Sequence, residues 1–121
     1  HPLRVMFSLA TDEERIVGVL HDVVEDCADQ GWTFDRLEAE GFSATVLSGL
    51  RAVTKLDGEA DYQEFVQRAA TDPIGRRVKM ADISDNLDIT RISKITEKDF
   101  DRLKRYKKAL SYLQNYEDIS D

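Results

Sequence analysis

The residues best suited to chemistry lie in one stretch, LHDVVEDC at positions 20–27. It places His21 beside Asp22 and adds two more carboxylates, Glu25 and Asp26, within the next helical turn. On a helix Asp22 and Asp26 face the same way, and like charges at this spacing destabilise a helix by about 0.2–0.5 kcal/mol. A bound cation would offset that repulsion, so the stretch suggests a metal site.

The HD pair can supply two ligands to such a site. His21 and Asp22 are neighbours on the predicted helix, so both side chains can reach one point beside it. Imidazole nitrogen with carboxylate oxygen suits a divalent ion such as Mn²⁺, Fe²⁺, Zn²⁺ or Mg²⁺. Further candidate ligands are His1, the only other histidine, and Asp82 in KMADISDN, which has Asn86 one turn later on the same face.

A plain structural interpretation of these residues stays open. A helix end that carries several acids is more often a solvated face, and an aspartate followed four residues later by an asparagine is often a surface pair. Spacing alone therefore leaves both a metal site and a solvated surface possible. Cys27 lies on the apolar stripe of its helix, so we expect it in the core rather than among the ligands.

Composition limits the class of protein. The 121 residues suit one domain, and 24 acidic against 17 basic side chains give a formal charge of -7. That charge argues against nucleic acid or an anionic membrane as partner, but a bound cation would still admit a small anionic ligand. A single cysteine indicates a reducing compartment, and no apolar run could cross a bilayer. We therefore expect a cytoplasmic protein.

The elements that must position these residues are helices. Apolar side chains recur at three- and four-residue intervals, which predicts helices at residues 12–27, 33–40, 43–55, 62–69 and 73–87 and from residue 96 onward. Thr11, Ser43 and the pair Asp72-Pro73 are predicted helix starts. The expected fold is all-α, a single domain of roughly six helices over residues 1–121. Because the chain opens at His1 without a methionine, we also expect an upstream segment.

Four segments, in this order, resemble a known family: HPLRV at position 1, LHDVVEDC at 20, AVTKLDGE at 52 and VKMADISDN at 78. Together they are similar to the motifs of HD-domain metal-dependent phosphohydrolases. Within that group they resemble the hydrolase domain of RelA/SpoT proteins and the small alarmone hydrolases. The resemblance covers most of the chain.

This resemblance implies an HD-type helical bundle and one divalent metal, typically Mn²⁺. The implied ligands are His1, His21, Asp22 and Asp82. It implies that Glu25 and Asp26 orient or activate the attacking water and that Asn86 lies at the nucleotide pocket. The implied reaction is removal of the 3′-pyrophosphate of (p)ppGpp.

The chain also departs from that family pattern. Ile83, Ser84 and Asp85 replace an arginine, a leucine and a histidine, and the family's upstream basic segment is absent from this sequence. Two alternatives therefore stay open: an HD nucleotidase or phosphatase acting on another nucleotide or phosphorylated metabolite, and a nucleotide-binding module without turnover. For a substrate-binding rim, the nearest basic candidates are Arg4, Lys55 and Lys79.

Overall fold

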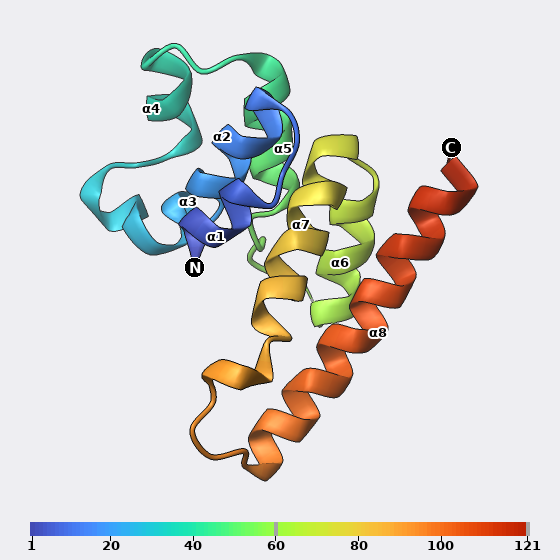
Figure 1. The fold of residues 1–121 in the computed structure, drawn as a ribbon. Helices are drawn as coiled ribbons and strands as arrows, with labels where there is room; N and C mark the ends of the chain where they lie inside the picture. The colour runs from blue at the N-terminus through green and yellow to red at the C-terminus, as the bar shows by residue number, and fades with distance from the viewer. Residues whose placement is uncertain (60, 121) are drawn as a thin grey trace.

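The chain folds as an all-α bundle, which confirms the predicted fold class. The computed structural model describes residues 1–59 and 61–120, with side chains described up to residue 117. The helices in chain order are α1 Pro2–Phe7, α2 Asp12–Leu20, α3 Val23–Cys27, α4 Phe34–Ala39, α5 Ala44–Ala52, α6 Tyr62–Ala70, α7 Pro73–Asn86 and α8 Glu97–Ser120, with short 3₁₀ helices at Ala28–Gln30 and Ile89–Arg91 (Figure 1).

Side-chain caps start several of these helices where the sequence predicted them. The hydroxyls of Thr11 and Ser43 accept hydrogen bonds from the backbone N–H groups three residues on. The Asp72 carboxylate does the same for α7, whose first residue is Pro73. Each cap satisfies a backbone donor that has no partner inside the helix.

The predicted continuous helix over residues 12–27 is wrong at its centre. It is broken at His21 and Asp22, which lie in a turn between α2 and α3. His21 Nδ1 lies 2.6 Å from the Gly18 carbonyl oxygen, a group that the N–H of residue 22 would bond in a regular helix. The side chain therefore competes with the backbone for that acceptor, and the HD pair sits at a bend. Cys27, expected in the core, is only half-buried.

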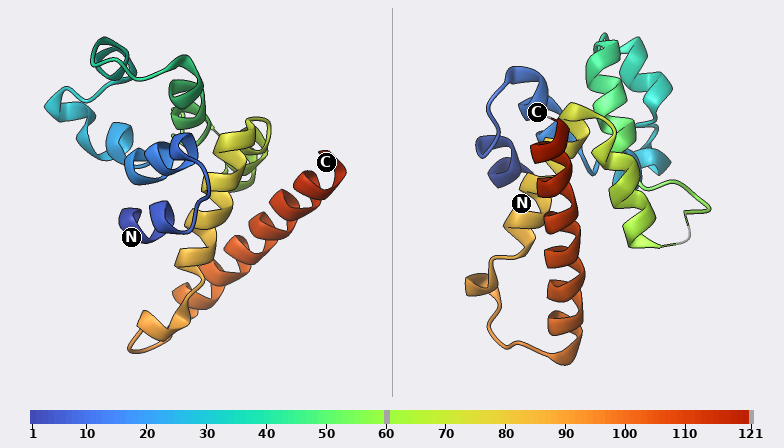
Figure 2. Two further views of the ribbon diagram at one scale, coloured as in Figure 1. Left: turned by 45° about the horizontal axis from the view of Figure 1, so that its top comes forward. Right: turned by 90° about the vertical axis from the view of Figure 1, so that its right-hand side faces the viewer.

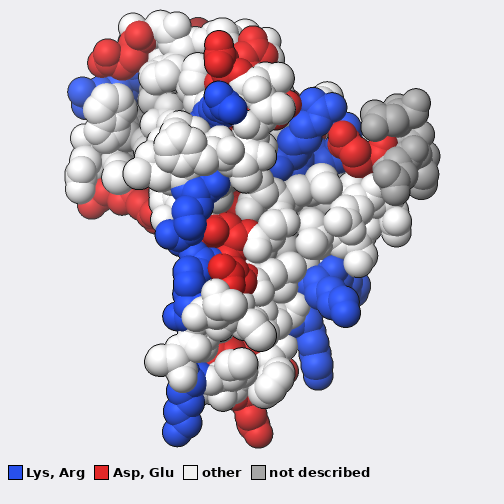
Figure 3. All heavy atoms as spheres, in the orientation of Figure 1, with Lys and Arg blue, Asp and Glu red and all other residues white. Residues whose placement is uncertain are grey.

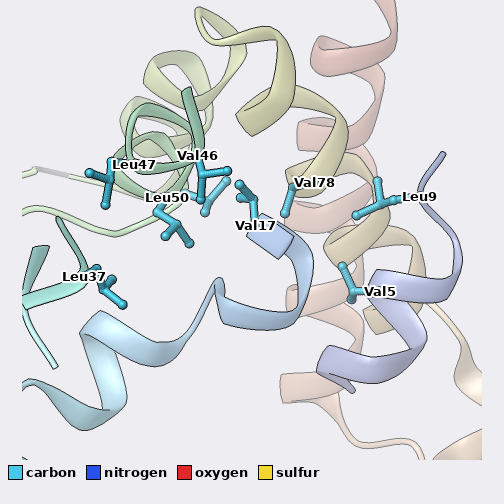
Figure 4. Close-up of a cluster of buried hydrophobic side chains, with 9 residues drawn as sticks. Val5, Leu9, Val17, Leu37, Val46, Leu47, Leu50 and Val78 are labelled. Carbon is cyan, nitrogen blue, oxygen red and sulfur yellow. The ribbon is translucent and has the colours of Figure 1, made fainter. Parts of the chain in front are cut away.

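Two hydrophobic cores share α7. The first takes side chains from α1, α2, α4, α5 and α7, including Val17, Leu50 and Val78 (Figure 4). The second is built by α6, α7 and α8 and contains Ile83 and Leu113. Accordingly, α8 lies on the α6–α7 side of the molecule, at the end away from α4 (Figures 1 and 2).

Close packing of α1 on α2 depends on Gly18. A Cβ atom at this position would lie 2.7 Å from Leu9 Cδ1 and 3.4 Å from Met6 Cα, so a larger residue would push the two helices apart. Because α1 begins directly after His1, this contact holds the first residue of the chain close to the bend at His21.

A charged anchor holds the end of α8 against α7. Glu117 accepts hydrogen bonds from Arg76 and Arg77, and the buried Arg76 also donates to the Ala70 carbonyl at 3.0 Å. Burial alone would raise the pKa of Glu117, but the two guanidinium groups outweigh it and hold the pKa below its ordinary value. Within the described residues, no helix is both long and apolar enough to span a membrane.

Glu117→Gln should lower the free energy of unfolding at pH 7 by about 1–3 kcal/mol, because the buried Arg76 loses its charged partner. The stabilisation by Glu117 is complete above its ordinary pKa of 4.5 and is lost as the pH falls towards its lower folded value. Urea unfolding at pH 7 and pH 3 should therefore show the variant converging on the wild type in acid.

Asp101→Asn is the matched control, since it removes one negative charge from an exposed position on the same helix. A Glu117→Gln protein as stable as Asp101→Asn at pH 7 would rule out this anchor.

Candidate metal centre

Three of the four predicted ligands meet at one point. His1 precedes α1, His21 lies at the bend after α2, and Asp82 is on α7. Each offers one ligand atom, and these atoms all lie within 4.8 Å of one another. The two imidazole rings are in edge-to-face contact with centroids 5.3 Å apart. Segments 81 residues apart in the sequence are thus brought together at one candidate cation site.

The Asp82 carboxylate is the centre of this cluster. It is only 8 % exposed, and it contacts His1 Nε2 at 2.7 Å and Lys79 Nζ at 3.1 Å. Asn86 Nδ2 donates to it at 3.2 Å. Burial alone would raise the pKa of Asp82, but His21 and Lys79 outweigh it and hold the pKa below its ordinary value. Asp82 is therefore ionised, as a metal ligand must be.

His21 presents a nitrogen suited to a cation. The Gly18 carbonyl can only accept a hydrogen bond, so Nδ1 of His21 carries a proton and Nε2 is the nitrogen that lies 3.3 Å from Asp22 Oδ2 and 3.5 Å from Asp82 Oδ1. Burial alone would lower the pKa of His21, but Asp82 and the Gly18 carbonyl outweigh it and raise the pKa. A bound cation would displace a proton from Nε2 and take its lone pair. That Nε2 is buried and has no hydrogen-bond partner among the described residues. A buried polar atom without a partner is costly. Two imidazoles and a carboxylate suit Mn²⁺, Fe²⁺ or Zn²⁺, so these residues fit a divalent metal.

Asp22 lies at the edge of the cluster. Its Oδ2 is 3.3 Å from His21 Nε2, but it is not among the three residues whose ligand atoms converge. Burial raises the pKa of Asp22, as do the charges of Asp82 and Asp26, while His21 lowers it; the net shift is upward. The repulsion between Asp22 and Asp26 that the spacing predicted is therefore present, and a cation here would relieve it.

Asp85 is a residue of this site that the sequence analysis missed. Its Oδ2 lies 2.5 Å from His1 Nδ1, so it fixes the ring with Nε2 directed at Asp82. The hydrogen bond from Arg4 and the charge of Arg4 hold the pKa of Asp85 below its ordinary value, and Arg91 lowers it further. Metal-binding histidines commonly bond a carboxylate through the other ring nitrogen. The sequence feature that could have revealed this role is the spacing of Asp85 from Asp82, because residues 82 and 85 share a helix face.

Glu25 and Asp26, which were expected to orient or activate the attacking water, have different surroundings in the structure. Both side chains are exposed on α3. Glu25 accepts a hydrogen bond from the Lys55 backbone N–H at 2.6 Å and lines a different cavity, beside residues 54–59. Asp26 is near enough to Asp22 to affect its pKa, and within the described part of the chain no side chain or backbone N–H bonds its carboxylate. Only Asp26 is thus both near the cluster and uncommitted.

The three basic residues expected at a substrate-binding rim do not lie together in the structure. Arg4 lies beside the cluster and lines a cavity that Asn86 and His1 share. Lys79 is buried against the rings of Tyr62 and Phe65, and it forms an ion pair with Asp82 rather than facing a substrate. Lys55 instead belongs to the loop that Glu25 binds.

No model of a known protein family matches this chain, and no curated protein does either. The expected relation to HD-domain phosphohydrolases therefore rests on the four sequence segments, and the candidate metal centre rests on the residues described above.

Asp85→Asn should weaken Mn²⁺ binding by about ten- to a hundredfold, because His1 loses the carboxylate that orients its ring. Titration of the chelator-treated protein with Mn²⁺, followed by electron paramagnetic resonance, gives the dissociation constant directly. Asp82→Asn should abolish measurable binding, whereas Asp101→Asn should match the wild type. Equal affinity in Asp85→Asn and the wild type would contradict the positioning role.

Proposed function

We propose that this protein is a metal-dependent phosphohydrolase that acts on a nucleotide. The observation that carries the proposal is the convergence of His1, His21 and Asp82, with the Nε2 atom of His21 buried and unpartnered. These three residues would hold one divalent ion, with Asp22 beside them as the fourth ligand. A cation bound there neutralises charge on a phosphoryl group and makes a water molecule more acidic.

The remaining steps fall to the chain's own side chains. Asp26 is the proposed base: it lies one helical turn after Asp22, and its carboxylate is exposed and not bonded by any described residue, so it can accept a proton from the attacking water. Glu25 has a supporting role, because its hydrogen bond to Lys55 ties α3 to the loop after α5. Asp85 and Lys79 orient His1 and Asp82 respectively.

The substrate proposed first is ppGpp, with hydrolysis at its 3′-pyrophosphate. This choice follows from the similarity of the four segments to the alarmone hydrolases and from the cavity that Asn86 and Arg4 line beside His1. Mn²⁺ is the metal to test first, followed by Fe²⁺, Zn²⁺ and Mg²⁺.

The purified protein with Mn²⁺ should release pyrophosphate from ppGpp, and Asp82→Ala should lower the rate by more than about a hundredfold, since even outer-shell losses cost ten- to a hundredfold. Product release is measured by anion-exchange chromatography against a panel of nucleotides and sugar phosphates. Lys104→Gln, at an exposed position on α8, is the control. An Asp82→Ala protein that keeps its activity would overturn the proposal.

The two acids on α3 should behave differently. Asp26→Asn should reduce kcat by about 10²–10⁴-fold, the usual contribution of a general base, whereas Glu25→Gln should cost about tenfold or less. The pair is matched, because each change removes one charge from an exposed position on the same short helix. A larger loss in Glu25→Gln than in Asp26→Asn would reverse the assignment.

A second candidate is an HD nucleotidase acting on a different phosphorylated substrate. It is favoured by Asp85, which stands where the family has a histidine and binds Arg4 and Arg91, two residues that line the cavity beside Asn86. Hydrolysis of another nucleotide, with no reaction on ppGpp, would select this candidate. Metal-dependent nucleotide binding without product would instead indicate a binding module.

A further inference from the structure

A second cavity, with a volume of about 500 Å³, lies between the end of α2, α3, the 3₁₀ helix Ala28–Gln30 and α4 (Figure 1). Its lining residues are Leu20, Val23, Cys27, Gln30, Trp32, Leu37, Glu40 and Phe42. Six of these eight are apolar, and none belongs to the candidate metal centre or to the cavity beside Asn86. The volume and the apolar lining are typical of sites that hold small organic molecules.

Backbone hydrogen bonds fix the walls of this cavity. The N–H of Trp32 donates to the Cys27 carbonyl at 3.2 Å, and the N–H of Phe42 donates to the Leu37 carbonyl at 3.3 Å. Leu37 belongs to the first core, and Leu20, Trp32 and Phe42 pack against that core while staying only partly buried. Apolar surface thus stays open in a site that is already formed, and a ligand would bury it without reordering the chain.

The polar groups of the lining favour a neutral ligand over an anion. Glu40 is the one charged residue in the described lining, and its Oε1 lies 3.8 Å from Arg36 Nε, outside the cavity. A buried anionic group would therefore find no cationic partner in these walls, which makes its binding costly. The indole N–H of Trp32 and the side-chain amide of Gln30 have no hydrogen-bond partner among the described residues, so they can bond a neutral polar substituent.

The cavity adjoins the HD pair without containing it. Leu20 is the last residue of α2 and Val23 is the first of α3, so the two residues that flank His21 and Asp22 both line the cavity. On the face shown in Figure 3, the surface around α3 and α4 at the upper left is broadly uncoloured, with acidic side chains at its edges. A nucleotide, which carries several negative charges, is an unfavourable occupant, and the ligand of this cavity is distinct from the proposed substrate.

We propose that this cavity is a binding site for a neutral aromatic molecule. The rings of Trp32 and Phe42 contact the faces or edges of such a ligand, as aromatic pairs do in protein cores. The aliphatic side chains of Leu20 and Val23 cover the rest of it. The inference is independent of the proposed function, because no residue of the candidate metal centre takes part.

The test uses N-phenyl-1-naphthylamine, a neutral aromatic dye, and its 8-sulfonate, which has the same rings and one negative charge. Trp32 is the only tryptophan of the chain, so energy transfer from tryptophan to the bound dye reports on this cavity. The wild type should bind one molecule of the neutral dye per chain. It should bind the sulfonate about tenfold more weakly, because that charge has no partner in the lining.

Cys27→Phe should weaken binding of the neutral dye by about tenfold or more, because the added ring occupies the space of the ligand. Cys27→Ala is the matched control, since it leaves that space open and should bind as the wild type does. Phe7→Ser, at a position on α1 that is 73 % exposed and outside the cavity, should also match the wild type. Thermal melting checks that each variant is folded. N-ethylmaleimide attached to Cys27, the only cysteine, should block the cavity without any substitution.

Three results would overturn the inference: no energy transfer from Trp32 to the neutral dye, sulfonate binding as tight as that of the neutral dye, or equal affinity in Cys27→Phe and Cys27→Ala. An equal loss in Phe7→Ser and Cys27→Phe would do the same, because it indicates binding to exposed apolar surface. A dimer in sedimentation velocity that Cys27→Phe abolishes would assign the cavity to a second copy of the chain instead. None of these results bears on metal binding or hydrolysis, which are measured separately.

Discussion

The structure depends on one buried carboxylate. Asp82 is ionised although it is 8 % exposed, and an isolated charge at that depth would be strongly unfavourable. It is surrounded by Lys79 and Asn86 of the same helix, by His1 just before α1 and by His21 at the bend after α2. Because Lys79 bonds Oδ2 whereas both imidazoles lie beside Oδ1, the charge of Asp82 can bind a cation as well as stabilise the fold.

This arrangement requires α1, α2 and α7 to meet closely. Gly18 allows the approach of α1 to α2, and its carbonyl also holds the ring of His21, so one residue determines both the helix spacing and the orientation of that ring. Val78 packs in the first core and Ile83 packs in the second, so both cores hold α7. Asp82 lies between these two positions in the sequence, so both cores hold the helix segment that carries it.

Local sequence was enough to predict most of the helices and the caps at Thr11, Ser43 and Asp72, because capping and apolar periodicity act within a few residues. It did not predict α1, Pro2–Phe7. The break at His21 could not be predicted, since it depends on where the imidazole bonds. The role of Asp85 depends on His1, which is 84 residues away. Glu25 is separated from Asp26 in role because it bonds Lys55, 30 residues away. Such pairings follow from tertiary packing, which no periodic pattern contains.

Asp85 joins the first residue of the chain to α7. Its Oδ2 bonds His1 and Arg91, and its Oδ1 bonds Arg4. The first core includes Val5 of α1 and Val17 of α2, while α8 packs in the second core. Both cores share α7, which carries Asp82 and Asp85. A substitution on α8 that weakens the second core can therefore lower the stability of the bundle while α1 and α2 keep their packing around the candidate site.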